Sequence, residues 1–220
     1  MGNRVPITVP GIEEYAQAHT TADPDHLLGL AAETRESCDR PVMMVGPVEA
    51  RFLQFFLYAQ QPRRVLEIGT FTGYSALSMA EALPDGGHID TCELSEKHAE
   101  IARRHIAASK YAYSVTVHVG PALETIRRLP GPYDFILLDA DQAHFPDYLD
   151  PLLDRLSDGG FLAVDNVLWD GAVLDEADQQ DSTRGVRLLN DTVASRPDLT
   201  CVMLTIRDGI MLIRRNRGGV

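Results

Sequence analysis

An apolar run followed by a glycine-punctuated loop is the feature of this chain with the clearest chemistry. Arg64–Ile68 has the pattern of a buried strand, and Gly69 and Gly73 follow it just before a helical pattern. Glycines at these positions allow backbone conformations, and a close approach of a ligand, that a Cβ would obstruct. The stretch predicts a turn that holds a ligand at the end of a strand. The alternative is a turn whose glycines serve backbone geometry alone.

Two acidic side chains favour the ligand-binding interpretation. Glu67 lies at the carboxyl end of its strand, and Glu93 ends a second apolar run about 20 residues beyond Gly73, where an acidic residue can bind a ribose. Phe71 stands where the Gly-x-Gly-x-x-Gly dinucleotide fingerprint needs its second glycine. Glu67 would also repel a phosphate, whereas it can accept hydrogen bonds from an ammonium group. The motif therefore favours S-adenosylmethionine over a dinucleotide.

Polar side chains also follow two later apolar runs. Asp139 comes directly after Leu137 and Leu138, and Asp165 and Asn166 follow a run that ends at residue 164. The ends of neighbouring strands can converge, so these three side chains offer oxygen donors of the kind that Mg²⁺ prefers. The alternative is that they only cap turns or helices.

Alternating strand and helix patterns would position these residues. The predicted strands are Arg64–Ile68, His88–Glu93, Ser114–Val119, Tyr133–Leu138 and Gly160–Val164. The predicted helices between them are Tyr74–Ala82, Glu96–Ala108, Ala122–Leu129 and Phe145–Leu156. This alternation predicts an α/β fold with a parallel sheet covered by helices on both faces.

The two ends of the chain depart from that alternation. After a predicted helix at Gly185–Ser195, two strand patterns, Leu199–Ile206 and Ile210–Arg214, are separated by a hairpin signal. Residues 1–60 carry helical patterns at Ile12–His19, His26–Glu36 and Pro47–Gln60. We therefore predict a single domain over residues 1–220, with a helical cap segment at 1–60 and a Rossmann-like core at 61–220.

Composition excludes several classes of function. The formal net charge of the 220 residues is −12, which argues against a nucleic-acid partner because neutralising phosphates needs clustered Lys and Arg. No apolar stretch approaches the roughly 18 residues of a membrane span. Residues 1–6 are not followed by the apolar segment of a secretory signal, so we expect a cytoplasmic protein. Cys38, Cys92 and Cys201 have neither disulfide nor zinc spacing, and the last two are expected to pack as small apolar residues in strands.

With these features in place, the chain resembles the divalent-metal-dependent O-methyltransferases of the catechol and caffeoyl-CoA type, a branch of the class I S-adenosylmethionine-dependent methyltransferases. The resemblance extends from about Pro41 to the C-terminus. The segments that carry it are Leu66–Ser75, Gly120–Ala122, Tyr133–Ile136, Leu138–Asp141, Asp165–Trp169 and Asp208–Gly209. It implies a seven-stranded mixed sheet with an antiparallel last strand, and a homodimer.

The resemblance also implies roles for individual residues. The residues implied to bind the cofactor are Glu67, Gly69 and Ser75 around its amino-acid portion, Glu93 on its ribose, Ala122 beside its adenine, and Asp139. Met43 resembles a position that closes over the cofactor, the alternative being a core methionine. The implied ligands of Mg²⁺, or of a similar ion, are Asp139, Asp165 and Asn166, and Trp169 and Asp170 would lie near the acceptor pocket.

One departure from the family pattern affects the proton transfer. The family often has a lysine three residues after the first metal-binding aspartate, where it is thought to take the hydroxyl proton, but this chain has Gln142. An amide cannot serve as that base. Either the metal alone acidifies the acceptor, or His144 takes the proton, its ordinary pKa near 6.5 being suitable. The catalytic candidates are therefore Asp139, Gln142 and His144.

These inferences predict an enzyme that moves a methyl group from S-adenosylmethionine to a hydroxyl of a small, catechol-like or natural-product acceptor with the help of Mg²⁺. Two alternatives remain at this point. One is a nucleoside-binding protein that kept the fold and lost catalysis, which Gln142 would favour. The other is a nicotinamide oxidoreductase, which the absent dinucleotide fingerprint and the terminal hairpin disfavour.

Overall fold

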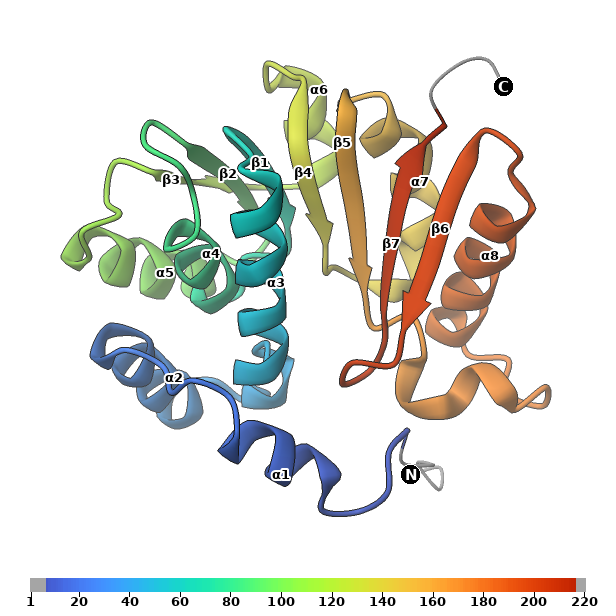
Figure 1. Ribbon diagram of the computed structural model, residues 1–220, viewed down its shortest axis with the longest axis horizontal. Coiled ribbons are helices and arrows are strands. Elements are labelled where there is room, and N and C mark those ends of the chain that lie inside the picture. Colours follow the sequence, from blue (N-terminus) through green and yellow to red (C-terminus); the bar gives the residue numbers. More distant parts are fainter. Residues whose placement is uncertain (1–6, 217–220) are drawn as a thin grey trace. The chain divides into compact units, whose positions relative to one another are not determined.

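The computed structural model describes residues 7–216 (Figure 1). Residues 1–6, on which the predicted absence of a secretory signal rests, lie outside the described residues. Two compact units make up the described chain: one is Glu14–Leu129, and the other combines residues 7–13 with residues 130–216. The single domain with its cap and core stays a prediction. Within residues 7–216, no helix has both the length and the apolar character needed to cross a membrane.

The structure confirms the predicted class, a seven-stranded mixed sheet with helices around it. The strands are β1 (Arg64–Ile68), β2 (His88–Glu93), β3 (Val115–Val119), β4 (Tyr133–Leu138), β5 (Leu156–Asp165), β6 (Leu199–Leu204) and β7 (Ile210–Arg215). The α-helices are α1 (Ile12–Ala18), α2 (Asp25–Ser37), α3 (Pro47–Gln60), α4 (Tyr74–Ala80), α5 (Glu96–Ala108), α6 (Ala122–Arg128), α7 (Phe145–Leu153) and α8 (Asp181–Ser195). Short 3₁₀ turns, which the sequence patterns missed, are η1 (Pro41–Met43), η2 (Gln142–His144) and η3 (Trp169–Leu174).

The unit Glu14–Leu129 contains the parallel strands β3, β2 and β1, in that order. Helices α3 and α4 pack side by side within it (Figure 1). Leu53 and Leu57 of α3 and Leu77 of α4 are fully or almost fully buried. Burial of these apolar side chains stabilises the packing of α3 against α4.

The second unit contains β4, β5, β7 and β6, in that order. Strand β5 runs parallel to β4, and β7 runs antiparallel to both of its neighbours, so the predicted hairpin is confirmed. Its turn needs a glycine, because Gly209 has a φ of 88° and a Cβ there would lie 2.5 Å from Cγ of Leu168. The hairpin turn is thereby packed against the loop that follows β5.

The boundary between α7 and β5 differs from the prediction. The helix predicted to reach Leu156 ends at Leu153, and the strand predicted to begin at Gly160 begins at Leu156. Leu156 pairs with Tyr133, and the register then shifts so that Phe161 pairs with Phe135. The prediction was wrong here because Ser-Asp-Gly-Gly has the composition of a turn, while its pairing with β4 depends on a distant segment.

The cysteines also divide into two environments. Cys92 is 2% exposed in β2, as expected of a small apolar residue in a strand. Cys201 is exposed on β6, and for this residue the expectation of a packed cysteine was wrong. Four consecutive residues of β6, from Thr200 to Met203, are exposed. The sequence pattern therefore predicted the strand but not which of its residues are buried.

Candidate functional site

The loop between β1 and α4 is built on positive φ angles, as its glycines predicted. Gly69 and Gly73 have φ values of 106° and 93°, and Phe71 between them has a φ of 47°. The backbone N–H groups of Gly69 and Thr70 donate to the carbonyl of Cys92 at 3.0 and 3.1 Å. A Cβ on Gly73 would also lie 3.1 Å from Cβ of Ala102. The backbone conformation therefore favours glycine at position 73, and packing against Ala102 leaves little room for a Cβ there.

Glu67 lies fully buried beneath this loop with one unused oxygen. Its Oε2 accepts a 2.5 Å hydrogen bond from the hydroxyl of Thr91, whereas its Oε1 has no partner among the described residues. Burial raises the pKa of Glu67 to about 7, and the hydroxyls of Ser75 and Thr91 oppose that rise. A buried carboxylate oxygen without a donor is costly unless a ligand supplies one. Glu67 can therefore accept from an ammonium group of a ligand.

Glu93 fixes the conformation of the same loop. Its Oε2 accepts from the backbone N–H of Phe71 at 2.7 Å, and its Oε1 accepts from the N–H of Ser95 at 2.8 Å. Sequence reasoning placed Glu93 on a ribose but missed these two internal bonds. A carboxylate has about four acceptor positions, so a ligand can still use Glu93 alongside them.

The remaining cofactor candidates of this unit have different surroundings. Ser75 is buried in the first turn of α4, close to Glu67. Ala122 is half-buried at the start of α6, just after Gly120, whose N–H donates to the carbonyl of Glu93 at 2.9 Å. Met43 is 47% exposed, so the alternative of a core methionine is wrong.

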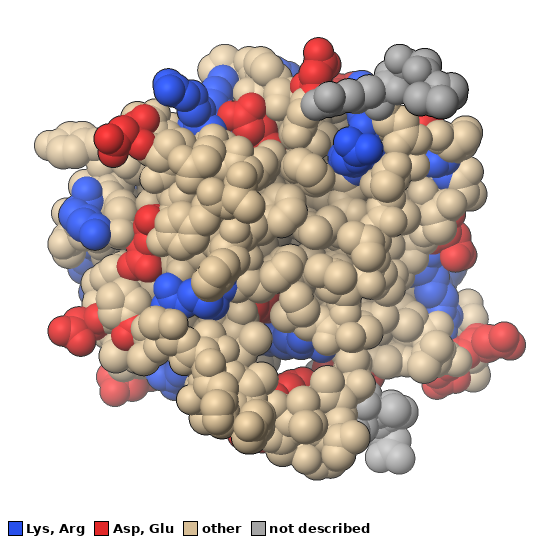
Figure 2. Space-filling view, in the orientation of Figure 1, with Lys and Arg blue, Asp and Glu red and all other residues tan. Residues whose placement is uncertain are grey.

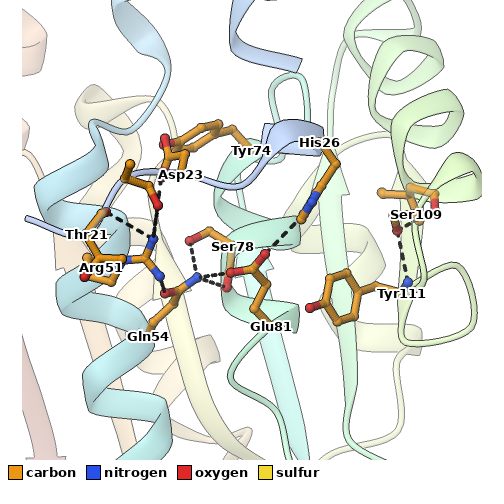
Figure 3. A network of polar contacts seen from close by, with 12 residues as sticks. Thr21, Asp23, His26, Arg51, Gln54, Tyr74, Ser78, Glu81, Ser109 and Tyr111 are labelled. Atoms are coloured by element: carbon orange, nitrogen blue, oxygen red, sulfur yellow. Dashed lines mark hydrogen bonds and ion pairs between the residues drawn. The ribbon is translucent and has the colours of Figure 1, made fainter. Parts of the chain in front are cut away.

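A polar network ties residues before the sheet to α4 (Figure 3). The hydroxyl of Tyr74 donates to Asp23 at 2.5 Å, and Arg51 lies 3.8 Å from the same carboxylate. Gln54 donates to the carbonyl of Ser78 at 2.8 Å, and His26 pairs with Glu81 at 3.2 Å. Figure 3 shows these side chains pointing toward one another from separate segments.

Replacing Tyr74 with phenylalanine should lower the free energy of unfolding by about 1–3 kcal/mol, because the almost buried Asp23 loses a donor. Chemical denaturation measures this quantity. The matched control is Tyr113→Phe, since Tyr113 is 97% exposed and the same change there should have almost no effect. Equal stability of Tyr74→Phe and the wild type would show that the bond to Asp23 adds nothing.

In the second unit, strand register brings the two predicted metal-binding aspartates together. Leu138 of β4 pairs with Val164 of β5, so Asp139 and Asp165 follow at neighbouring strand ends. Asp165 is 2% exposed and accepts from the N–H of Asn166 at 2.6 Å, whereas Asp139 is half-buried. Asn166 itself has a φ of 59°, a conformation that asparagine tolerates better than most residues.

Gln142 and His144 have different neighbours. Nε2 of Gln142 donates to Oδ1 of Asn166 at 3.4 Å, so Gln142 lies beside a predicted metal ligand. The side chain of His144 is 63% exposed, and its Nδ1 lies 2.7 Å from Asp141. Asp141 also accepts from the N–H of Ala143, which makes it the N-cap of η2.

Asp208 contributes to this region in a way that sequence reasoning missed. The hairpin signal identified it as a turn residue, yet its carboxylate accepts from the N–H of Asp170 at 2.6 Å. Its backbone carbonyl accepts from the N–H of Leu168 at 2.9 Å. Burial raises the pKa of Asp208 to about 6, and hydrogen bonds from Asp170 and Asn166 oppose the rise. The signal that could have identified Asp208 is that it belongs to Asp208–Gly209, one of the segments that carry the family resemblance.

The donor chemistry of the second unit fits a hard cation. Asp139, Asp165 and Asn166 offer carboxylate and amide oxygens, which suit Mg²⁺ and do not suit a soft metal. Over the part of the chain that the structure describes, no group of three or more His, Cys, Asp and Glu side chains could hold a metal ion. The predicted set contains two such residues, and its third donor is an amide.

Comparisons with known proteins agree with these features. A family model described as O-methyltransferase matches residues 17–216. A catechol O-methyltransferase of Niastella koreensis is 31% identical over 184 residues, covering 82% of this chain and 83% of that protein. A probable caffeoyl-CoA O-methyltransferase of Dictyostelium discoideum is 29% identical over 210 residues, covering 93% and 91%.

A solved structure has the same fold. The O-methyltransferase TomG of Streptomyces achromogenes, which is involved in tomaymycin synthesis and was crystallised with S-adenosylmethionine, has a TM-score of 0.86. It is 30% identical to this chain, and the match covers 94% of this chain and 96% of TomG.

Proposed function

The chain belongs to the O-methyltransferase family, and from this premise we propose that it moves the methyl group of S-adenosylmethionine to one hydroxyl of a small aromatic acceptor. The acceptor carries two adjacent hydroxyls, as in a catechol or a related natural product, and Mg²⁺ assists the reaction. Membership of this family excludes the alternative function of a nicotinamide oxidoreductase. The alternative without catalysis is a protein that binds the cofactor only.

The cofactor proposal is supported by the chemistry around the β1–α4 loop. Glu67 would accept from the ammonium group of the cofactor, because its Oε1 is buried without a donor in the described chain. Gly69 and Ser75 would border the same amino-acid portion, and Glu93 would accept from the ribose hydroxyls. We propose that Ala122 lies beside the adenine and that Met43 closes over the cofactor.

The single observation that carries the metal proposal is the register of β4 and β5, in which Leu138 pairs with Val164, so that Asp139 and Asp165 each come one residue after this pair. These two residues and Asn166 would hold the cation, and Asp139 would also border the cofactor. When bound, the cation would supply Lewis acidity that lowers the pKa of an acceptor hydroxyl. Gln142 would orient Asn166 through its amide and would not take a proton, since an amide nitrogen is not a base at neutral pH.

The chemical step that follows needs no covalent intermediate on the protein. The acceptor oxygen forms a bond to the methyl carbon as the bond from that carbon to the sulfonium sulfur breaks, and sulfur keeps the electron pair as a neutral thioether. The hydroxyl proton leaves to solvent or to a nearby base. The residues named above would contribute mainly by holding the two reactants in line.

Replacing His144 with alanine should leave kcat within about twofold of the wild type at each pH. A general base contributes about 10²–10⁴-fold only when it reaches the reacting proton, and we propose that His144 does not act as that base. His144 is exposed and paired with Asp141, so we propose that metal binding alone acidifies the acceptor. Steady-state kinetics from pH 6 to pH 9 measure the outcome. A loss of about 100-fold or more would instead assign the proton transfer to His144.

The experiment that tests the function is transfer of a labelled methyl group from S-adenosylmethionine to a panel of catechols and natural-product phenols, with Mg²⁺ and with a chelator. We expect transfer to acceptors with adjacent hydroxyls in the presence of Mg²⁺, and little transfer with the chelator. Binding of S-adenosylmethionine without transfer to any acceptor would instead support the binding-only alternative.

We further propose a single domain that works as a homodimer in the cytoplasm, without a nucleic-acid or membrane partner. On the face drawn in Figure 2, basic and acidic side chains are interspersed, and basic side chains do not form one large patch there. Phe55 and Tyr58 of α3 are 68% and 50% exposed, which supports an interface between copies of the chain.

A further inference from the structure

Three residues of helix α8 that contact the segments after β4 and β5 carry this inference. Gly185 lies against η2, where a Cβ would be 2.2 Å from the carbonyl oxygen of Gln142. Nδ2 of Asn190 donates to the carbonyl of Val167 at 2.8 Å, one residue beyond Asn166. Helix α8 therefore packs against the backbone that follows the predicted metal ligands after each of the two strands.

The third residue, Arg187, binds the backbone of one loop, residues 172–178. Its guanidinium donates to the carbonyls of Ala172 at 2.8 Å, Val173 at 3.1 Å and Asp178 at 2.9 Å, and also to the carbonyl of Asp175. All four acceptors are main-chain oxygens, so Arg187 sets the path of the loop whatever side chains the loop carries. A planar guanidinium with five donors can do this, whereas a lysine ammonium cannot span the same set.

The loop begins directly after a backbone segment of unusual conformation. Trp169, Asp170 and Gly171 have φ values of 49°, 51° and 80°, and the N–H of Asp170 is bound by Asp208. Residues 174–177 beyond it are exposed. Exposed residues gain little from packing, so hydrogen bonds restrain this part of the loop. Besides the bonds to Arg187, the hydroxyl of Thr183 on α8 donates to the carboxylate of Asp178 at 3.0 Å. Arg187 is the side chain that binds the backbone at both ends of the loop.

We propose that Arg187 is a positioning residue that determines acceptor specificity, because it holds loop 172–178 in one conformation next to Trp169 and Asp170. The inference rests on the proposed function, in which those two residues border the acceptor. The acceptor concerned is a planar phenol with adjacent hydroxyls. Arg187 itself needs no contact with the acceptor.

The test compares Arg187→Gln and Arg187→Lys with Arg184→Gln, a matched control that removes the same charge from an exposed position of α8. For Arg187→Gln we expect the KM of the preferred acceptor to rise about tenfold and the two monomethylated products of a catechol to approach equal amounts, with kcat and cofactor affinity within about threefold. Arg187→Lys should be intermediate, and Arg184→Gln should match the wild type. Amide hydrogen exchange of residues 172–178 should accelerate only in the Arg187 variants.

The outcomes separate the inference from the proposed function. A wild type that methylates no acceptor would overturn both. An active wild type, together with an Arg187→Gln variant that keeps the acceptor KM and the product ratio, would overturn the inference alone. Equal losses of cofactor affinity, kcat and thermal stability in Arg187→Gln and Arg187→Lys would show a general structural role and would also overturn it.

Discussion

Replacing Asp165 with alanine should lower the Mg²⁺-dependent rate of methyl transfer by about 10³-fold or more, because Lewis-acid assistance is worth several kcal/mol of the activation barrier. Asp165 is 2% exposed at the end of β5, and Asp139 follows the neighbouring strand β4. Removal of its carboxylate would leave the cation without one of its two charged ligands. Methyl transfer measured over a range of Mg²⁺ concentrations tests this expectation.

The strand itself offers a control for this substitution. Asp158→Ala removes an exposed aspartate from an earlier part of β5 and should leave the rate unchanged. Cofactor affinity should stay within about threefold, or about 0.7 kcal/mol, in both variants, since Asp165 is not among the residues proposed to bind the cofactor. A wild-type rate in Asp165→Ala, or in the wild type with a chelator, would contradict the metal proposal.

Replacing Glu67 with glutamine should weaken binding of S-adenosylhomocysteine about 10–100-fold at pH 8, because a hydrogen bond between a carboxylate and an ammonium group is lost. The wild-type affinity should also depend on pH. The pKa of Glu67 is raised to about 7 by burial, so each pH unit below 7 should cost about tenfold in affinity, and the affinity should level off above it. The glutamine variant should show no such dependence.

The same pKa gives a prediction for the ligand-free protein. The folded state holds the Glu67 proton more tightly than the unfolded chain, whose pKa is near the ordinary 4.5, so the folded state binds more protons between these values. The contribution of this proton to stability is complete below about pH 4.5 and is lost as the pH rises through 7, a change of up to about 3 kcal/mol. Glu67→Gln should lack this fall.

Calorimetric titration and chemical denaturation at pH 5.5, 7 and 8 measure both quantities. Glu124→Gln is the control, because Glu124 is an exposed glutamate in the first turn of α6. An affinity of the wild type that does not change with pH would contradict the proposed contact between Glu67 and the ammonium group. A Glu67→Gln variant with the wild-type pH dependence would assign that dependence to another group.

Much of the fold could be read from local patterns. Strands β1, β2 and β4 and helices α3 and α5 have the predicted boundaries. Periodicity, glycines and proline breakers are properties of neighbouring residues, and they act within a few positions of the chain. The boundary between α7 and β5 was wrong because it is set by pairing of Leu156 with Tyr133, which no local pattern contains.

The candidate site likewise has features that local sequence predicts and features that depend on tertiary contacts. Sequence alone identified the glycine loop, the acidic residues at the ends of β1 and β2, and the aspartates after β4 and β5, because turn chemistry and strand ends place such residues predictably. Only the tertiary structure decided that Glu93 binds the loop backbone, that His144 pairs with Asp141 and that Arg187 holds loop 172–178. A hydrogen bond forms only over a narrow range of donor–acceptor distances and angles, and only folding brings these partners within that range.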